Sequence, residues 1–68
     1  MPTIEKIDVK PDGVWVRLRD GSKRRYAYGV IGPEDIHMVS MGDDRASIVI
    51  HLRSGASIVR DVESLEAP

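Results

Sequence analysis

Two histidines and two pairs of neighbouring acids are the side chains whose types could support metal binding or acid–base chemistry. They are His37, His51 and the acid pairs at 34–35 and 43–44. A metal site needs three or four convergent ligands, and this spacing indicates no such set. The acid pairs fall in predicted turns, where carboxylates cap backbone amides. A chain of 68 residues has little room for a catalytic cleft, and it contains no cysteine. We therefore expect no enzyme activity, no catalytic residue, no metal and no cofactor.

Trp15 is the only tryptophan, and it lies in a segment where apolar and other residues alternate. Because side chains alternate across a strand, Arg17 and Arg19 share its face. Tryptophan and arginine are enriched in protein interfaces. Trp15 could instead cover an edge of the core and stack on an arginine. A second segment with the same alternation adds three equivalent positions, and the predicted partner-binding set is Trp15, Arg17, Arg19, Val49, His51 and Arg53.

A basic and aromatic segment follows a predicted hairpin at Asp20-Gly21. Positive charges that follow phosphates and rings that stack on bases are typical of single-stranded nucleic-acid sites. Residues 1–34 carry a net charge of +2 and residues 35–68 a net charge of -3, so the basic region is local. The overall net charge of -1 argues against strong attraction to phosphates. Both tyrosines are also natural core residues of a strand. The alternative nucleic-acid set is Lys23, Arg24, Arg25, Tyr26 and Tyr28.

The elements that must position these side chains are predicted to be short strands. Valine and isoleucine number 15 against three leucines, and six glycines and four prolines interrupt the chain at short intervals. Gly32-Pro33-Glu34-Asp35 breaks the strand pattern and suits one helical turn. Residues 63–68 are expected to form a tail with one turn of 3₁₀ helix. The predicted strands cover residues 3–10, 14–19, 23–31, 36–41, 46–53 and 56–62.

The two halves of the chain match each other. Residues 14–22 align with residues 48–56 at an offset of 34, and the preceding strands align at an offset of 32. Alternation before a glycine turn is common to hairpins, so chance similarity is the alternative to duplication. A repeat over 1–34 and 35–68 predicts two three-stranded meanders, each covering the apolar face of the other. The expected fold is a single all-β domain over 1–68, with five or six antiparallel strands in a partly open barrel or a sandwich. At the level of fold alone, this pattern is similar to the small barrels of the SH3, Sm and Tudor kind.

Size and composition lead to the functional prediction. Domains of about 60 residues bury only about 60% of their unfolded surface, so we expect a homo-oligomer. No apolar run is long enough to span a membrane, and no signal peptide is evident, so we expect a cytoplasmic location and no membrane partner. The predicted function is a non-enzymatic module that self-associates and binds an unidentified protein. The arginine-rich composition suits a bacterial or phage accessory protein. A small nucleic-acid-binding barrel is the alternative.

Overall fold

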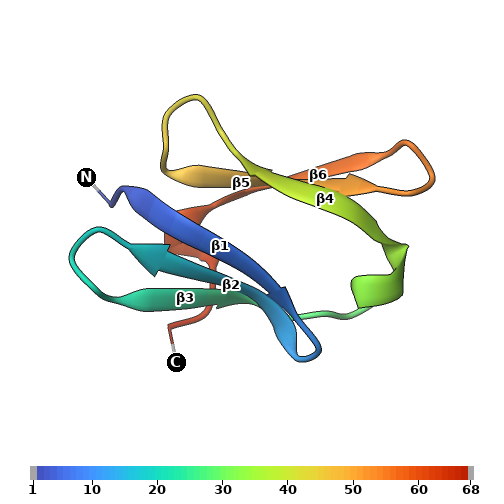
Figure 1. Ribbon diagram of the computed structural model, residues 1–68, viewed down its shortest axis with the longest axis horizontal. Coiled ribbons are helices and arrows are strands. Elements are labelled where there is room, and N and C mark those ends of the chain that lie inside the picture. Colours follow the sequence, from blue (N-terminus) through green and yellow to red (C-terminus); the bar gives the residue numbers. More distant parts are fainter. Residues whose placement is uncertain (1, 68) are drawn as a thin grey trace.

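Six strands in two antiparallel sheets make up the chain in the computed structural model, which describes residues 2–67 (Figure 1). One sheet has the order β1-β2-β3 and the other the order β4-β5-β6. The prediction of an all-β chain built from two three-stranded meanders is confirmed. The strands are β1 (Ile4–Lys10), β2 (Gly13–Leu18), β3 (Lys23–Tyr26), β4 (Ile36–Met41), β5 (Ser47–Leu52) and β6 (Ser57–Asp61), and the 3₁₀ turns are η1 (Pro33–Asp35) and η2 (Val62–Ser64).

The two sheets have equivalent strand registers. The positions that align in the sequence at offsets of 32 and 34 also occupy matching places in the two ladders. Each sheet has a β-bulge near the start of its first strand, at corresponding positions. The register therefore allows comparison of the two sheets residue by residue. Matching pairs are Ile7–Val16 with Val39–Ile50 and Val9–Val14 with Met41–Ile48, and the bulges lie between Ile4 and Lys6 and between Ile36 and Met38.

The second hairpin of each sheet closes in the same way. The N–H of Leu18 donates to the carbonyl of Ser22, and the N–H of Gly21 donates to the carbonyl of Leu18. The same two bonds occur 34 residues later. This is a three-residue loop with glycine in the left-handed region, rather than the two-residue turn that the sequence suggested. Gly21 and Gly55 have φ values of 92° and 97°.

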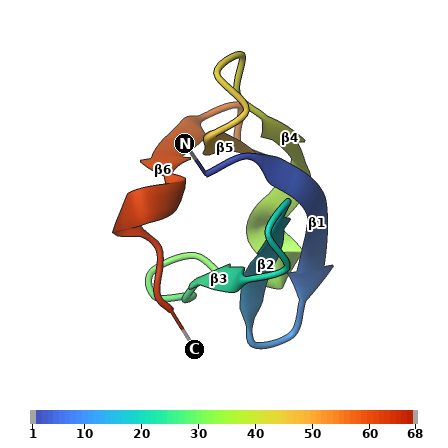
Figure 2. The same ribbon diagram turned by 90° about the vertical axis from the view of Figure 1, so that its left-hand side faces the viewer.

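The core lies between the two sheets (Figure 2). The inward residues of β2 and β5 are buried, as alternation predicts, except for the half-buried Leu52. Most of the buried side chains are β-branched. The last part of the chain also belongs to the core, because Val62 and Leu65 are buried. Residues 63–67 are therefore not a free tail, and residue 68 lies outside the described part. The buried apolar residues are Ile4, Val14, Val16, Leu18, Ile36, Ile48, Ile50, Val62 and Leu65.

The third strand ends at Tyr26, five residues before its predicted end. Among the strands β3 pairs only with β2, and Tyr26 lies opposite Val14, the first residue of β2 that has a partner on β3. Beyond Tyr26 the chain leaves the sheet and crosses to η1, and Val30 is completely exposed. The length of β3 is thus set by the length of its partner and not by its own alternation.

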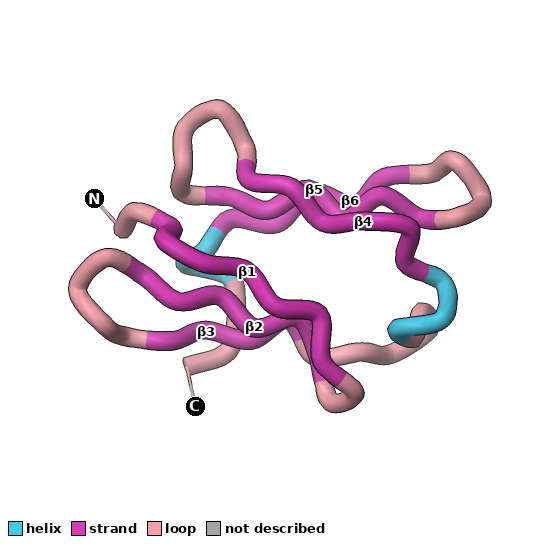
Figure 3. Tube along the Cα trace, viewed as in Figure 1, coloured by secondary structure: helices cyan, strands magenta, loops and turns pink. Residues whose placement is uncertain are grey.

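The sandwich stays open at its sides. Within residues 2–67 no strand ladder joins the two sheets, and the only bridge outside the named strands pairs Arg25 with Glu66. The two sheets therefore do not close into a barrel in this part of the chain, in agreement with the predicted partly open barrel or sandwich (Figure 3). None of the helical segments between residues 2 and 67 is long and apolar enough to cross a membrane.

Candidate functional site

The six predicted partner-binding residues do not form one surface. Trp15 and Arg17 alternate with buried residues of β2, so they lie on the outer face of the β1-β2-β3 sheet. Val49 and His51 lie at the equivalent positions of β5, on the outer face of the other sheet. Because the core lies between the sheets, these two pairs point in opposite directions. Arg19 and Arg53 are exposed in the turns that follow β2 and β5.

The basic residues of β3 also divide between two faces. Arg24 lies opposite the buried Val16, and its Nη1 donates to the carbonyl of Leu65 at 3.2 Å. Tyr26 lies on the same inner side and packs against the core. Lys23 and Arg25 point to the outer face. The predicted nucleic-acid set is therefore split, and only part of it can meet a ligand from outside.

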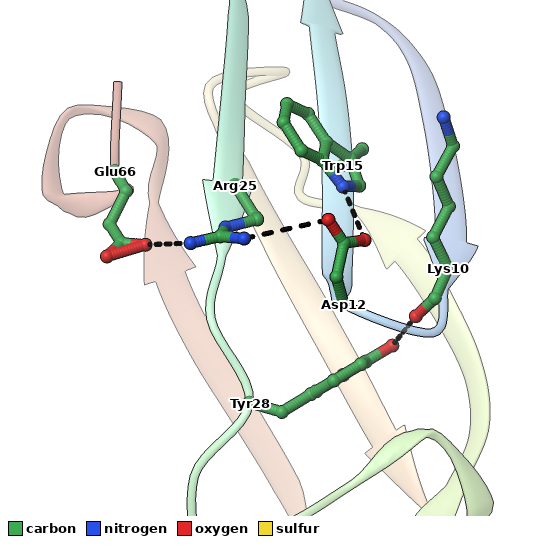
Figure 4. Close-up of polar contacts among 6 residues, drawn as sticks. All are labelled: Lys10, Asp12, Trp15, Arg25, Tyr28 and Glu66. Atoms are coloured by element: carbon green, nitrogen blue, oxygen red, sulfur yellow. Dashed lines mark hydrogen bonds and ion pairs between the residues drawn. The ribbon is translucent and has the colours of Figure 1, made fainter. Parts of the chain in front are cut away.

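Tyr28 lies beyond the end of β3 and has a structural contact. Its hydroxyl donates to the carbonyl of Lys10 at 2.7 Å. Burial, helped by the carboxylates of Asp12 and Glu34, raises the pKa of Tyr28, so the hydroxyl keeps the proton that it donates. This bond ties the crossing segment to the turn between β1 and β2 (Figure 4).

The outer face of the first sheet instead gathers a different set, which we call the Trp15 face. Trp15 lies at its centre, with Asp8 of β1 on one side and Arg25 of β3 on the other. The next row places Arg17 between Lys6 and Lys23. The Trp15 face consists of Lys6, Asp8, Lys10, Trp15, Arg17, Lys23 and Arg25.

Asp12 fixes the orientation of Trp15 (Figure 4). The indole N–H donates to Asp12 Oδ1 at 2.9 Å, and Arg25 Nη1 lies 3.6 Å from Asp12 Oδ2. The bond from Trp15, with the charges of Arg25 and Lys10, holds the pKa of Asp12 below its usual range. The Nζ of Lys10 and the guanidinium carbon of Arg25 each lie 5.8 Å from the centroid of the Trp15 ring. The indole is thus held between two cations before any ligand arrives.

The C-terminal segment holds Arg25 from the other side. Arg25 Nη2 donates to Glu66 Oε2 at 3.0 Å, and the two backbones exchange hydrogen bonds of 2.9 Å. Arg25 therefore links Asp12 in the first turn to Glu66 near the end of the chain. A guanidinium group held by two carboxylates loses little further freedom on binding.

Trp15 lies between two shallow hollows. The first has a volume of about 210 Å³ and is lined by Lys6, Asp8, Arg17 and Lys23 beside the indole. The second has a volume of about 380 Å³ and is lined by Arg25, Glu66 and Ala67. The half-buried indole is the one side chain shared by both hollows. A partner that covers Trp15 can place a side chain on either side of it.

The charges of the Trp15 face are nearly balanced. Five cations lie on it, and four carboxylates, on or beside it, are paired with three of them. Lys10 and Lys23 have no ion pair within residues 2–67. Exposed pairs of this kind contribute little to stability, but they lower the positive potential. The pairs are Lys6–Asp8, Arg17–Glu5, Arg25–Asp12 and Arg25–Glu66.

The contributions of Lys6, Lys10 and Asp12 to this face did not emerge from the sequence analysis. The alternation of β1 was a usable signal, because an antiparallel neighbour of the Trp15 strand must place Lys6 and Asp8 beside it. The role of Asp12 had no comparable signal, since it depends on the conformation of the turn.

The outer face of the second sheet has an apolar character. Met38 and Val59 are 49% and 58% exposed. Between them, Ser40 Oγ lies 3.0 Å from His51 Nε2. No group of three or more histidine, aspartate or glutamate residues within residues 2–67 could hold a metal ion.

No protein-family model, no curated protein and no solved structure matches this chain. Its function must therefore be inferred from the chemistry of its two outer faces.

Proposed function

We propose that this chain is a small non-enzymatic interaction module that self-associates and binds a protein partner through the Trp15 face. The observation that carries the proposal is the preorganised indole. Asp12 and two flanking cations hold Trp15 in place between two hollows. Rigid aromatic anchors with adjacent pockets are typical of the centres of protein interfaces. A cytoplasmic location and a bacterial or phage origin belong to the same proposal.

The charge balance favours a protein over a nucleic acid. Affinity for nucleic acids comes mainly from cations that neutralise phosphates, and three of the five cations here are already paired with carboxylates. A protein segment can bind through a few complementary contacts with this face. An apolar side chain would enter a hollow beside Trp15, and a carboxylate would pair with Lys10 or Lys23. The expected partner segment therefore combines acidic and apolar residues.

A labelled peptide of alternating aspartate and leucine residues provides the first test. We expect saturable binding, followed by fluorescence anisotropy, that weakens at least about tenfold in Trp15→Ala, because such a substitution at an interface centre costs about 2 kcal/mol or more. Val49→Ala is the matched control, since Val49 occupies the equivalent position on the opposite face. An equal loss of affinity for the peptide in both variants, or no loss of affinity in Trp15→Ala, would reject this face as the binding site.

Nucleic-acid binding is a second candidate, and one observation favours it. All five cations of the face lie on the same side of one sheet as Trp15. A mixed-sequence single-stranded oligonucleotide, followed by Trp15 emission at low and moderate salt, tests this candidate. Steep salt dependence that flattens in Lys23→Ala but not in Arg53→Ala would put nucleic acid first. An unchanged emission at low salt would remove it.

A further inference from the structure

Strand β4 is a sheet edge without a charged residue. It lies at the end of the order β4-β5-β6, and between residues 2 and 67 the backbone from His37 to Met41 hydrogen-bonds to β5 alone. Strand β1 of the other sheet lies close to part of β4 but does not pair with it. Its sequence is Ile-His-Met-Val-Ser-Met. The edge strands of natural sheets usually carry charges or prolines that prevent pairing with other chains. Strand β4 has neither.

Strand β1, the corresponding edge of the other sheet, does carry such protection. Four of its seven residues are charged. The shared register makes β1 and β4 comparable position by position, and at three positions a charged residue of β1 is matched by an uncharged residue of β4. The two edges thus have the same place in the fold and opposite chemistry. The matched positions are Glu5 with His37, Lys6 with Met38 and Asp8 with Ser40.

The neutral edge continues into a neutral outer face. Met38 of β4 lies opposite His51 of β5, and Val49 of β5 lies opposite Val59 of β6. The hydroxyl of Ser40 lies 3.0 Å from Nε2 of His51, between these two pairs. Two rows of outward residues cross this sheet, Met38–His51–Ser57 and Ser40–Val49–Val59. None of these residues is an acid, a lysine or an arginine. This face therefore differs from the Trp15 face, which carries five cations.

We propose that β4 pairs antiparallel with β4 of a second copy of this chain. The product is a twofold dimer with a continuous sheet in the order β6-β5-β4-β4-β5-β6. Pairing satisfies the free backbone groups along both edges. This inference rests on the self-association that is part of the proposed function, and it specifies the surface.

A second copy fits this edge better than a foreign strand for two reasons. A twofold contact presents the same residues from both sides, and a strand without charges meets no like-charge repulsion when paired with itself. A small domain without disulfides also commonly gains stability by oligomerisation. Pairing through β1 would instead remove water from four charged side chains.

The double substitution Met38→Lys with Ser40→Asp tests the edge. It transfers to β4 the Lys6–Asp8 pair that β1 already carries at matching positions, so the sheet is known to accommodate it. By sedimentation velocity from micromolar to millimolar concentration, we expect the dimer dissociation constant to rise at least about tenfold. Ser54→Lys with Ala56→Asp adds the same charges in the exposed β5–β6 turn and should leave the dimer intact.

Single cysteines provide a second measurement that does not depend on weakening the dimer. The natural chain has no cysteine, so any disulfide-linked dimer reports the introduced position. Under mild oxidation we expect one of Met38→Cys, Val39→Cys and Ser40→Cys to cross-link most strongly, because a residue near the twofold axis meets its own copy. Val59→Cys, on the face, and Ser54→Cys, in the turn, should cross-link weakly.

The outcomes separate this inference from the proposed function. A wild-type chain that remains monomeric at millimolar concentration would overturn self-association and this inference together. A dimer that resists the charge pair, or that cross-links best through Val59→Cys, would overturn the β4 edge and leave self-association standing. Binding of the labelled peptide at the Trp15 face is measured separately, and the charge-pair variant of β4 should retain this binding.

Discussion

Asp12 shows how one residue in a turn can define a binding surface. Its carboxylate accepts the indole N–H of Trp15 and lies 3.6 Å from Nη1 of Arg25. The lowered pKa of Asp12 records the same contacts, since they stabilise the ionised form. Without the negative charge, the indole loses its strongest restraint and the flanking cation loses its partner. The shape of the Trp15 face therefore depends on Asp12 remaining ionised.

Acidification should disturb Trp15 through Asp12. A carboxyl whose pKa is lowered by folding stabilises the folded state fully above its unfolded value of about 3.9 and loses that contribution as the pH falls through the lower folded value. We expect Trp15 emission to change as the pH falls below about 4, and to change much less in Asp12→Asn. An acid titration of emission measures this.

Asp20→Asn is the control for that titration. The hydroxyl and backbone N–H of Ser22 also lower the pKa of Asp20, which lies in the β2–β3 turn. Its replacement should therefore reduce the acid dependence of stability, while the emission change of Trp15 persists. If both variants lost the emission change equally, Trp15 would be reporting global unfolding and not the state of Asp12.

At the scale of elements, Gly13 determines how β2 and β3 come together. A Cβ atom on Gly13 would lie 2.6 Å from the carbonyl oxygen of Tyr26 and 2.8 Å from Cγ of Arg25. Gly13 lies next to Val14, whose pairing with Tyr26 is the last in the β2–β3 ladder. Only glycine lets the end of β3 approach so closely.

Gly13→Ala should destabilise the chain more than Gly21→Ala. Alanine at Gly21 meets no atom within 4 Å, so its cost is the left-handed backbone alone, about 1 to 2 kcal/mol. Alanine at Gly13 adds a clash with backbone that cannot move without opening the β2–β3 pair. Urea unfolding of the two variants measures both free energies. A cost for Gly13→Ala equal to or below that of Gly21→Ala would show that β3 shifts freely.

The elements that the sequence predicted well are those fixed by local alternation. Residues 36–41 match the predicted strand, and the apolar positions of β2 and β5 are buried as expected. The predicted end of β3 was wrong because a strand needs a partner, and Tyr26 lies opposite Val14, the first residue of β2 that pairs with β3. A 3₁₀ turn was expected near the end of the chain and is present as η2. Its packing onto the core was not foreseen, because Val62 and Leu65 lie three residues apart in a short turn, where no repeated period reveals a buried face.

The candidate site was harder to predict than the fold. Alternation placed Trp15 and Arg17 on one face, and this is where they lie. It could not show that the matching residues of the second half, Val49 and His51, point away from them, because this depends on how the two sheets stack. The link from Arg25 to Glu66 joins residues 41 apart in the chain, and no pattern in the sequence indicates it.

At the scale of the whole molecule, the two sheets share a backbone plan and differ in their outer surfaces. One outer face carries five cations around a tryptophan, and the other carries exposed apolar residues beside an unprotected edge. The central residues of the two outer faces point in opposite directions, so we expect pairing through β4 to leave Trp15 of each copy exposed. A dimer would then present two binding sites, and a partner with two matching segments would bind more tightly than one with a single segment.

Thermal unfolding offers a test of the whole assembly. Because a dimer that dissociates on unfolding is stabilised by mass action, the Tm of the wild-type chain should rise with protein concentration. The charge-pair variant Met38→Lys with Ser40→Asp should have a Tm that is independent of concentration. The difference in Tm between the two proteins should therefore shrink as both are diluted. Calorimetry over a wide concentration range measures this. A wild-type Tm that stays constant while sedimentation shows a dimer would mean that association adds nothing to folding. The buried apolar residues between the two sheets would then hold the sandwich together alone.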